Sequence, residues 1–267
     1  MKLEGKRILL TGAGGGIGSL IASILAEKGA RLALVDRNYQ ALEKNIDHLN
    51  SDERPLILSL DLLDAKARNS AVDQAMKHLG GIDLLINNAG MMSFRPFHEE
   101  DPEIIQRIVQ LNTLVPMQLT HKVLPHMLER NSGQIVNVGS TFGSIAFAWF
   151  ATYSTSKFGL RGFSEALRRE LAHTGVGVTY VAPRAVKTKL NSSAIYRMAE
   201  TVKMNMDEPE WVAKRIVASI EKERNDVYLG FPESLFVRIN GLWPRLVDGA
   251  MKKQNLKMMP FAKESSS

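Results

Sequence analysis

The chain has 267 residues, of which 45% are hydrophobic and 23% are charged, and it contains no cysteine. This composition is that of a folded globular protein, and it excludes a disulfide framework, a thiol nucleophile and a zinc site built on cysteine. The formal net charge is +6, but residues 236–263 hold six basic side chains and one acid, so the rest of the chain is nearly neutral and offers no broad basic surface to a nucleic acid.

Short apolar runs alternate with stretches of helical spacing, which predicts a parallel sheet with helices on both faces. The predicted strands are Arg7–Thr11, Arg31–Asp36, Leu56–Leu60, Ile82–Ile86, Gly133–Gly139, Val176–Ala182 and Val227–Gly230. The predicted helices are Gly16–Lys28, Tyr39–Asn50, Asp64–Leu79, Pro102–Gln110, Asn112–Arg130, Tyr153–His173 and Asp207–Glu223. We expect an α/β fold, a Rossmann-type doubly wound sheet of about seven strands, in one domain over residues 1–231, and a C-terminal appendage over residues 232–267.

No targeting segment is evident in the sequence. The N-terminal stretch contains an acid, Glu4, and only a short apolar run, so we expect no signal peptide. No apolar run approaches the ~18–20 residues that span a bilayer. Together with the absence of cysteine, this predicts a cytoplasmic protein.

A glycine-rich loop, Thr11–Gly18, joins the first predicted strand to the first predicted helix. Glycines let the backbone turn tightly and approach a pyrophosphate, and the helix N-terminus offers N–H groups and a positive dipole end. The strand before the loop and the helix after it favour a dinucleotide site over a merely tight turn.

The second predicted strand ends at Asp36, which follows Gly18 by 18 residues. An acid near this position accepts hydrogen bonds from the adenosine ribose and repels the additional phosphate of NADP. The neighbouring Arg37 could instead bind that phosphate. We therefore predict NAD as the cofactor and keep NADP as the alternative; Asp36 could also serve as the N-cap of the helix that follows.

Tyr153 and Lys157 are four residues apart on one predicted helix, and Ser140 follows the fifth predicted strand. The spacing brings the ammonium near the phenol, where a cation favours the phenolate form of a group whose ordinary pKa is about 10. Taken alone, such a pair is equally well explained as two side chains on a helix surface.

With Asp61, Asn87–Gly90, Asn112, Pro183 and Thr188, these motifs resemble the NAD(P)-dependent short-chain dehydrogenase/reductase family over residues from about 5 to 230. The resemblance implies that Tyr153 exchanges a proton with the substrate oxygen and that Ser140 hydrogen-bonds this oxygen. It implies that Lys157 lowers the pKa of Tyr153 and binds the nicotinamide ribose, and that Asn112 holds a water in a proton relay.

The resemblance also implies which residues bind the cofactor: Gly12, Gly15, Gly16, Ile17, Gly18, Asp36, Arg37, Asp61, Leu62, Asn88, Ala89, Gly90, Tyr153, Lys157, Pro183, Val186 and Thr188. Asn87 is expected to tie neighbouring strands together instead. One position departs from the family, which has Pro-Gly where this chain has Pro183-Arg184. Arg184 is expected either to alter this loop or to reach an acidic group of the substrate.

Apolar side chains predominate where the substrate would bind. They follow the fourth predicted strand (Met91, Met92, Phe94), precede Tyr153 (Phe142, Phe147, Trp149, Phe150) and occur in residues 189–206 (Ile195, Tyr196, Met198, Val202, Met204, Met206). This predicts a bulky hydrophobic secondary alcohol or ketone that is lipid-, steroid- or terpenoid-like. These side chains could instead pack against one another or against a second subunit. The six histidines show no metal-ligand spacing, so we predict no metal site.

The C-terminal appendage has apolar residues at three- and four-residue steps, and Pro244 divides it into two expected short helices. The apolar set is Leu235, Phe236, Ile239, Leu242, Trp243, Leu246, Val247 and Ala250. Such a basic amphipathic pair could lie on an anionic membrane, at the inner face of a cell membrane. We favour instead that its apolar face packs on the domain, over the substrate pocket or against a partner subunit.

Three functions are compatible with these observations. The first is an oxidoreductase that transfers a hydride between a nicotinamide cofactor and a secondary alcohol or ketone. The others are a catalytically silent dinucleotide-binding regulator and a membrane-associated lipid-binding protein on the same fold. The presence of Ser140, Tyr153 and Lys157 together favours the enzyme. The resemblance also implies a homodimer or homotetramer formed through the helices Asn112–Arg130 and Tyr153–His173.

Overall fold

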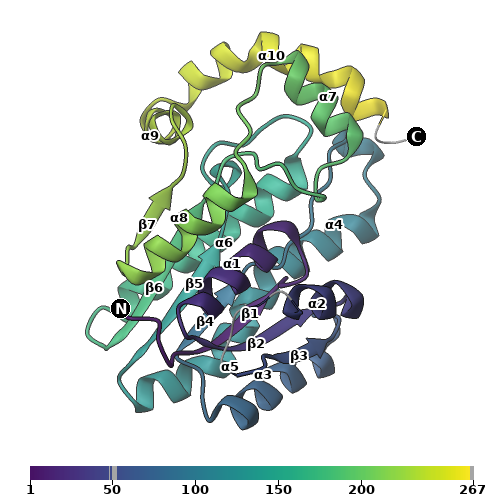
Figure 1. Ribbon diagram of the computed structural model, residues 1–267. Coiled ribbons are helices and arrows are strands. Elements are labelled where there is room, and N and C mark those ends of the chain that lie inside the picture. The colour runs from purple at the N-terminus through teal and green to yellow at the C-terminus, as the bar shows by residue number, and fades with distance from the viewer. Residues whose placement is uncertain (48, 50–52, 265–267) are drawn as a thin grey trace.

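A seven-stranded parallel sheet forms the centre of the protein in a computed structural model that describes residues 1–47, 49 and 53–264 (Figure 1). The strands are β1 (Arg7–Thr11), β2 (Arg31–Asp36), β3 (Leu56–Ser59), β4 (Leu84–Asn87), β5 (Gly133–Val138), β6 (Val176–Ala182) and β7 (Asp226–Tyr228). Their order in the sheet is β3-β2-β1-β4-β5-β6-β7. The order reverses between β1 and β4, which confirms the predicted doubly wound fold and places the ligand crevice at the carboxyl ends of these two strands.

Helices cover both faces of the sheet (Figure 1). One face carries α1 (Gly16–Glu27), α2 (Tyr39–Ile46) and α8 (Pro209–Glu221), and the other carries α3 (Ala65–Leu79), α5 (Val115–Glu129) and α6 (Ala151–Glu170). Alternate side chains of β1 enter the two cores: Ile8 and Leu10 face one core and Leu9 faces the other, and all three are fully buried. Burial on both faces explains the nearly continuous apolar runs of the strands.

Some helices differ from their predicted bounds. The two helices predicted over residues 102–130 form one continuous rod, in which α4 (Pro102–Val109) leads through a single π-helical turn (Gln110–Leu114) into α5. The sequence suggested a break there because the wider turn interrupts the 3.6-residue periodicity. The segment 189–206, for which no element was assigned, contains helix α7 (Ser193–Thr201). The predicted end of the second helix at Asn50 lies outside the described residues.

Pro244 separates α9 (Glu233–Leu242) from α10 (Pro244–Glu264), as predicted, but α10 is not short, since it runs for 21 residues. It packs against α7 and α9 at one end of the molecule (Figure 1). Contacts with the body come from Val237, Met258 and Ala262, which are buried, whereas most of the predicted apolar face is exposed. Among the described residues, no helix is both long and apolar enough to span a bilayer.

Arg184 ties the C-terminal helices to the sheet. Its guanidinium group donates to both oxygens of Asp207, at 3.0 and 2.6 Å, and to Glu233 at the start of α9, at 2.8 Å. It also donates to the carbonyl of Phe231 at 3.1 Å. The charge of Arg184 is thus matched by two carboxylates of the protein rather than left for an acidic substrate, and an altered loop after β6 stays a prediction.

We predict that Arg184→Ala lowers the stability by about 2 kcal/mol, because Asp207 and Glu233 are then left partly buried without their cation. The measurement is thermal unfolding followed by circular dichroism. Lys187→Ala is the matched control: it removes an ion pair with Glu208 in which both side chains are largely exposed, and it should cost less than about 0.5 kcal/mol. Equal decreases of the unfolding temperature in the two variants would contradict this role for Arg184.

Candidate active site

The glycine-rich loop packs directly against the end of β4. Gly12 has a φ of +68°, and a Cβ there would lie 2.8 Å from Cα of Ala89. A Cβ on Gly18 would lie 1.9 Å from the carbonyl oxygen of Gly12. Only glycine fits at these two positions, because the loop turns back on itself against the neighbouring strand.

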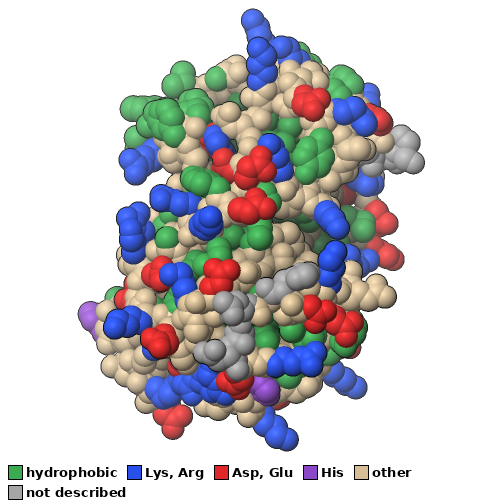
Figure 2. Space-filling model, viewed as in Figure 1, with side chains coloured by type: hydrophobic (Ala, Val, Ile, Leu, Met, Phe, Trp, Pro, Cys, Tyr) green, Lys and Arg blue, Asp and Glu red, His purple; other side chains and the backbone are tan. Residues whose placement is uncertain are grey.

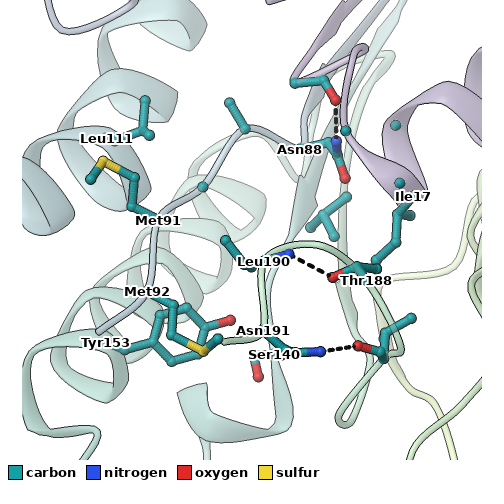
Figure 3. A pocket seen from close by; sticks show the side chains of 18 of the residues that line it. Ile17, Asn88, Met91, Met92, Leu111, Ser140, Tyr153, Thr188, Leu190 and Asn191 are labelled. Atoms are coloured by element: carbon teal, nitrogen blue, oxygen red, sulfur yellow. Dashed lines mark hydrogen bonds between the residues drawn. The ribbon is translucent and has the colours of Figure 1, made fainter. Parts of the chain in front are cut away.

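Asn88 and Thr11 hold this packing in place. The amide of Asn88 donates to the carbonyls of Thr11 and Gly12, both at 3.2 Å, and is turned toward the loop (Figure 3). The hydroxyl of Thr11 accepts the backbone N–H groups of Asn88 at 3.0 Å and of Ala89 at 3.1 Å. Asn87 donates to Asn137 of the adjacent strand at 2.8 Å, which confirms its predicted role between strands.

The start of α1 suits a phosphate group. Gly15 is the N-cap and supplies no capping side chain, so the first-turn N–H groups have no side-chain acceptor, and Gly16, Ile17 and Gly18 line the crevice. A Cβ added to Gly15 would meet only the Gly12 carbonyl, at 3.4 Å. The backbone is therefore open to close approach by a pyrophosphate.

A cavity of about 390 Å³ extends from this loop to Tyr153. Every residue predicted to bind the cofactor lines it, from Gly12 through Asp36, Asp61, Asn88 and Thr188 to Lys157. Ser140 lines it as well, whereas Asn112 lies behind it and is fully buried. Lining residues that the sequence did not indicate as site residues include Leu111, Leu190 and Asn191, whose positions depend on how the loops fold over the crevice.

Asp36 is fixed at the end of β2 by two backbone groups. One carboxylate oxygen accepts the N–H of Gly14 at 3.0 Å, and the other accepts the N–H of Asn38 at 3.0 Å. Asn38, rather than Asp36, is the N-cap of α2, since its side chain accepts the N–H of Ala41 at 3.1 Å. The alternative that Asp36 caps this helix is therefore wrong. The exposed Arg37 lines the cavity beside it.

Tyr153 and Lys157 share one face of α6 and are both buried. The Nζ atom of Lys157 lies 5.7 Å from the centre of the Tyr153 ring and donates to the carbonyl of Val138 at 3.0 Å. Burial raises the pKa of Tyr153 to about 12, opposed by a hydrogen bond with Ser140, and burial lowers the pKa of Lys157 to about 8. The protein alone thus does not produce the predicted lowering of the Tyr153 pKa, because desolvation raises this pKa by more than the hydrogen bond with Ser140 lowers it.

Ser140 follows β5 and is positioned by Tyr180 of β6. The hydroxyl of Tyr180 donates to the Ser140 carbonyl at 3.2 Å, and the hydroxyl of Ser140 accepts the N–H of Phe142 at 3.1 Å. Ser140 and Tyr153 lie at one end of the cavity and Asn88 at the other (Figure 3). The two hydroxyls can together hold one substrate oxygen.

Asn112 sits in the π-helical turn, and its amide is fully engaged. Its oxygen accepts the N–H of Met91 at 2.8 Å, while its nitrogen donates to the Met91 carbonyl at 2.8 Å and to the Ser156 hydroxyl at 2.9 Å. The side chain therefore positions the strand end and α6. A part for Asn112 in a water relay stays a prediction.

Glu100 is a buried residue near the site that the sequence did not single out. Its carboxylate accepts the hydroxyl of Thr152 at 2.5 Å and the hydroxyl of Ser93. It thereby links the segment after β4 to the residue that precedes Tyr153. No sequence signal marked this contact, because Glu100 lies in the run His98–Asp101, which is typical of a loop and helix start.

The apolar residues around Tyr153 form one cluster. Phe94 stacks on Phe150 with ring centres 4.6 Å apart, and Phe142 stacks on Phe147 at 4.4 Å. Met258 of α10 belongs to the same cluster. The alternative that these aromatic side chains pack against one another therefore holds in part, but Phe142, Phe150, Ile195, Met198 and Met204 also line the cavity. Among the described residues, no group of histidine and acidic side chains could hold a metal ion.

Comparison with known proteins agrees with this geometry. The family profile described as short chain dehydrogenase matches residues 6–198. Ketoacyl reductase HetN of Nostoc is 34% identical over 84% of this chain and 78% of its own length. Putative oxidoreductase SadH of Mycobacterium tuberculosis is 32% identical over 97% of this chain and 99% of its own length.

Solved structures share the fold. A short-chain dehydrogenase from Streptomyces avermitilis superposes with a TM-score of 0.79 at 28% identity, covering 93% of this chain and 96% of its own. A short chain dehydrogenase/reductase from Burkholderia phymatum, solved in complex with NAD, has a TM-score of 0.83 at 22% identity, covering 92% of this chain and 96% of its own. The chain therefore belongs to the short-chain dehydrogenase/reductase family.

Proposed function

We propose that this chain, an oxidoreductase of the short-chain dehydrogenase/reductase family, interconverts a bulky apolar secondary alcohol and its ketone with NAD. The observation that carries the proposal is a single cavity with a phosphate-binding glycine loop at one end and Ser140, Tyr153 and Lys157 at the other. Such an arrangement places a dinucleotide between the two ends and leaves its reactive ring beside the hydroxyls.

The chain's own residues would orient the substrate and move its proton. A bound nicotinamide supplies the hydride chemistry. Ser140 and Tyr153 hydrogen-bond the substrate oxygen, and Tyr153 donates a proton to it in ketone reduction or accepts one in alcohol oxidation. Below about pH 8 Lys157 carries a positive charge 5.7 Å from the centre of the phenol ring, which stabilises the phenolate when it forms, and it can also bind the cofactor ribose.

The apolar lining supports a hydrophobic substrate. Phe142, Phe150, Ile195, Met198 and Met204 surround the end of the cavity next to Tyr153, and flexible methionines adapt to irregular apolar ligands. The name of the Nostoc relative describes the reduction of a ketoacyl group. A lipid-, steroid- or terpenoid-like alcohol or ketone fits this lining.

Asp36 supports NAD rather than NADP. Its carboxylate is held by the N–H groups of Gly14 and Asn38 at the ribose end of the cavity, where a negative charge repels an additional phosphate. Arg37 is the group through which NADP could bind instead. Oxidation of the alcohol is the favoured direction with NAD.

Exposed apolar residues support a homodimer or homotetramer. Leu114, Met117 and Leu128 lie on the π-helical turn and α5, and Phe158 lies on α6; all four are exposed in the single chain. Burying such residues against a second copy would stabilise an assembly.

The absence of cysteine fits a reducing compartment, and we place the protein in the cytoplasm.

We predict that Tyr153→Phe lowers kcat by about 10³-fold, because it removes the acid–base hydroxyl. The Kd for NADH, measured by fluorescence titration, should remain within about twofold of the wild-type value. The assay is NADH consumption with a panel of long-chain and polycyclic ketones, with small sugar ketones for comparison. Tyr39→Phe, which alters an exposed tyrosine of α2, is the control and should be fully active.

NADH binding without consumption of any ketone would favour the silent regulator, and unchanged turnover of Tyr153→Phe would refute the acid–base role. Turnover of the small sugar ketones alone would overturn the apolar substrate class.

We predict that kcat/KM for alcohol oxidation rises with pH, because Tyr153 must lose its proton and burial holds its pKa high. Lys157→Met should lower kcat/KM by about tenfold or more below about pH 8, where Lys157 carries the cation that stabilises the phenolate, and by less above it. The measurement is a pH–rate profile between about pH 6 and 10. Lys66→Met, on the outside of α3, should leave the profile unchanged, and a Lys157→Met profile that matches the wild type below about pH 8 would contradict the role of Lys157.

We predict that Asp36→Asn raises the ratio of kcat/KM for NADP to that for NAD by roughly tenfold or more, because the charge that repels the phosphate is removed. Asparagine keeps an acceptor for the N–H of Gly14, so the loop should stay in place. Arg37→Gln is the counterpart variant and should leave NAD turnover within about twofold. A wild-type protein that prefers NADP would overturn the proposal for NAD.

A further inference from the structure

A group of large apolar side chains projects from α9 and the first half of α10. Leu242, Trp243 and Leu246 are 69%, 62% and 65% exposed, and every residue from 241 to 246 is exposed. Leu235 and Phe236 of α9 add to the group. Hydrophobic side chains gather at the upper left of Figure 2, over α9 and the beginning of α10. Contiguous apolar surface of this kind marks an interaction site.

The same two helices carry exposed basic side chains: Arg238, Arg245, Lys252, Lys253 and Lys257. None of these five forms an ion pair within the part of the chain that the structure describes. The acids between residues 232 and 257 are Glu233 and Asp248, and Glu233 already pairs with Arg184. The surface thus combines exposed apolar side chains with an excess of unpaired positive charge.

We propose that this α9–α10 surface, made of the five apolar and five basic residues above, docks the protein on an anionic lipid bilayer. A bilayer interface accepts tryptophan and leucine beside its acyl chains while its phosphates neutralise lysine and arginine. A second copy of the chain fits less well, because a two-fold symmetric contact would bring the same cations together.

The surface is held firmly on the body of the protein. Trp149 donates to the carbonyl of Asn255 at 3.1 Å, and Asn240 donates to the carbonyl of Ser144 at 2.8 Å. Met258 and Ala262 are fully buried. Removing the C-terminal helices would therefore expose the apolar cluster around Tyr153. Point substitutions of the exposed side chains test membrane docking without this disturbance.

Docking would bring the substrate cavity next to the bilayer. Met258 of α10 packs in the same apolar cluster as Met198 and Tyr153, which line the cavity. This consequence rests on the proposed function: an apolar alcohol or ketone would dissolve in the same bilayer on which the protein docks. The docking itself does not depend on turnover.

The test is co-sedimentation of the full-length protein with vesicles of phosphatidylcholine alone or mixed with about 30% phosphatidylglycerol. We expect the wild type to sediment with the mixed vesicles and to be released by high salt. Trp243→Ser/Leu246→Ser should weaken binding by roughly tenfold or more. The matched control is Phe97→Ser/Trp211→Ser, which removes two exposed aromatic side chains elsewhere and should bind like the wild type.

The charge contribution is tested separately with Arg245→Gln/Lys252→Gln/Lys253→Gln. Each cation near an anionic surface contributes about a fivefold effect, so the triple variant should bind about 100-fold more weakly. Lys66→Gln/Lys77→Gln/Lys214→Gln alters three exposed lysines of α3 and α8 and should stay within about twofold of the wild type. Circular dichroism verifies that each variant is folded.

Failure of the wild type to sediment with mixed vesicles, or equal binding by the wild type and both surface variants, would overturn the proposal. A lipid-free dimer that dissociates in Trp243→Ser/Leu246→Ser would assign the surface to a subunit contact and overturn it as well. Tyr153→Phe should sediment like the wild type, so vesicle binding is judged independently of the proposed enzymatic function.

Discussion

The contact between the glycine-rich loop and the end of β4 is the constraint on which the site depends. Gly12 and Gly18 permit it, because any side chain at either position would collide with backbone, and Asn88 and Thr11 hold it with four hydrogen bonds. The contact brings the start of α1 and the segment after β4 to the same crevice. The N-terminus of α1, which is open to a phosphate group, and Tyr153 thereby line one cavity.

A second set of buried contacts sets the other end of the cavity. Asn112 joins the segment after β4 to α6 through Met91 and Ser156, and Glu100 makes a parallel link through Thr152. Tyr180 fixes Ser140 from the neighbouring strand. Tyr153 and Lys157 are consequently held in a dry environment, where burial opposes the charged form of each. A bound cofactor and substrate would act on groups that are already in place.

The strands were predictable from the sequence because apolar runs are local signals, and the cofactor-side lining of the cavity was predictable because its motifs resemble those of the family. Long-range contacts were not. The π-helical turn at Asn112 interrupted the helical period, the carboxylate of Glu100 gave no pattern, and the ion pairs of Arg184 with Asp207 and Glu233 join residues 23 and 49 positions apart. The periodicity of α9 located an apolar face, but only the packing of Val237 and Met258 shows which side faces the body.

The proposed function depends on the transfer of a hydride between a nicotinamide and an apolar carbonyl carbon in this cavity. The most direct measurement is incubation with NADH that carries deuterium at both C4 positions of the nicotinamide and a long-chain or polycyclic ketone, followed by mass spectrometry of the product. We predict one deuterium on the carbinol carbon of the alcohol, and no more than a trace of labelled alcohol with Tyr153→Phe. An alcohol without the label, or no alcohol from any apolar ketone, would contradict the proposed function.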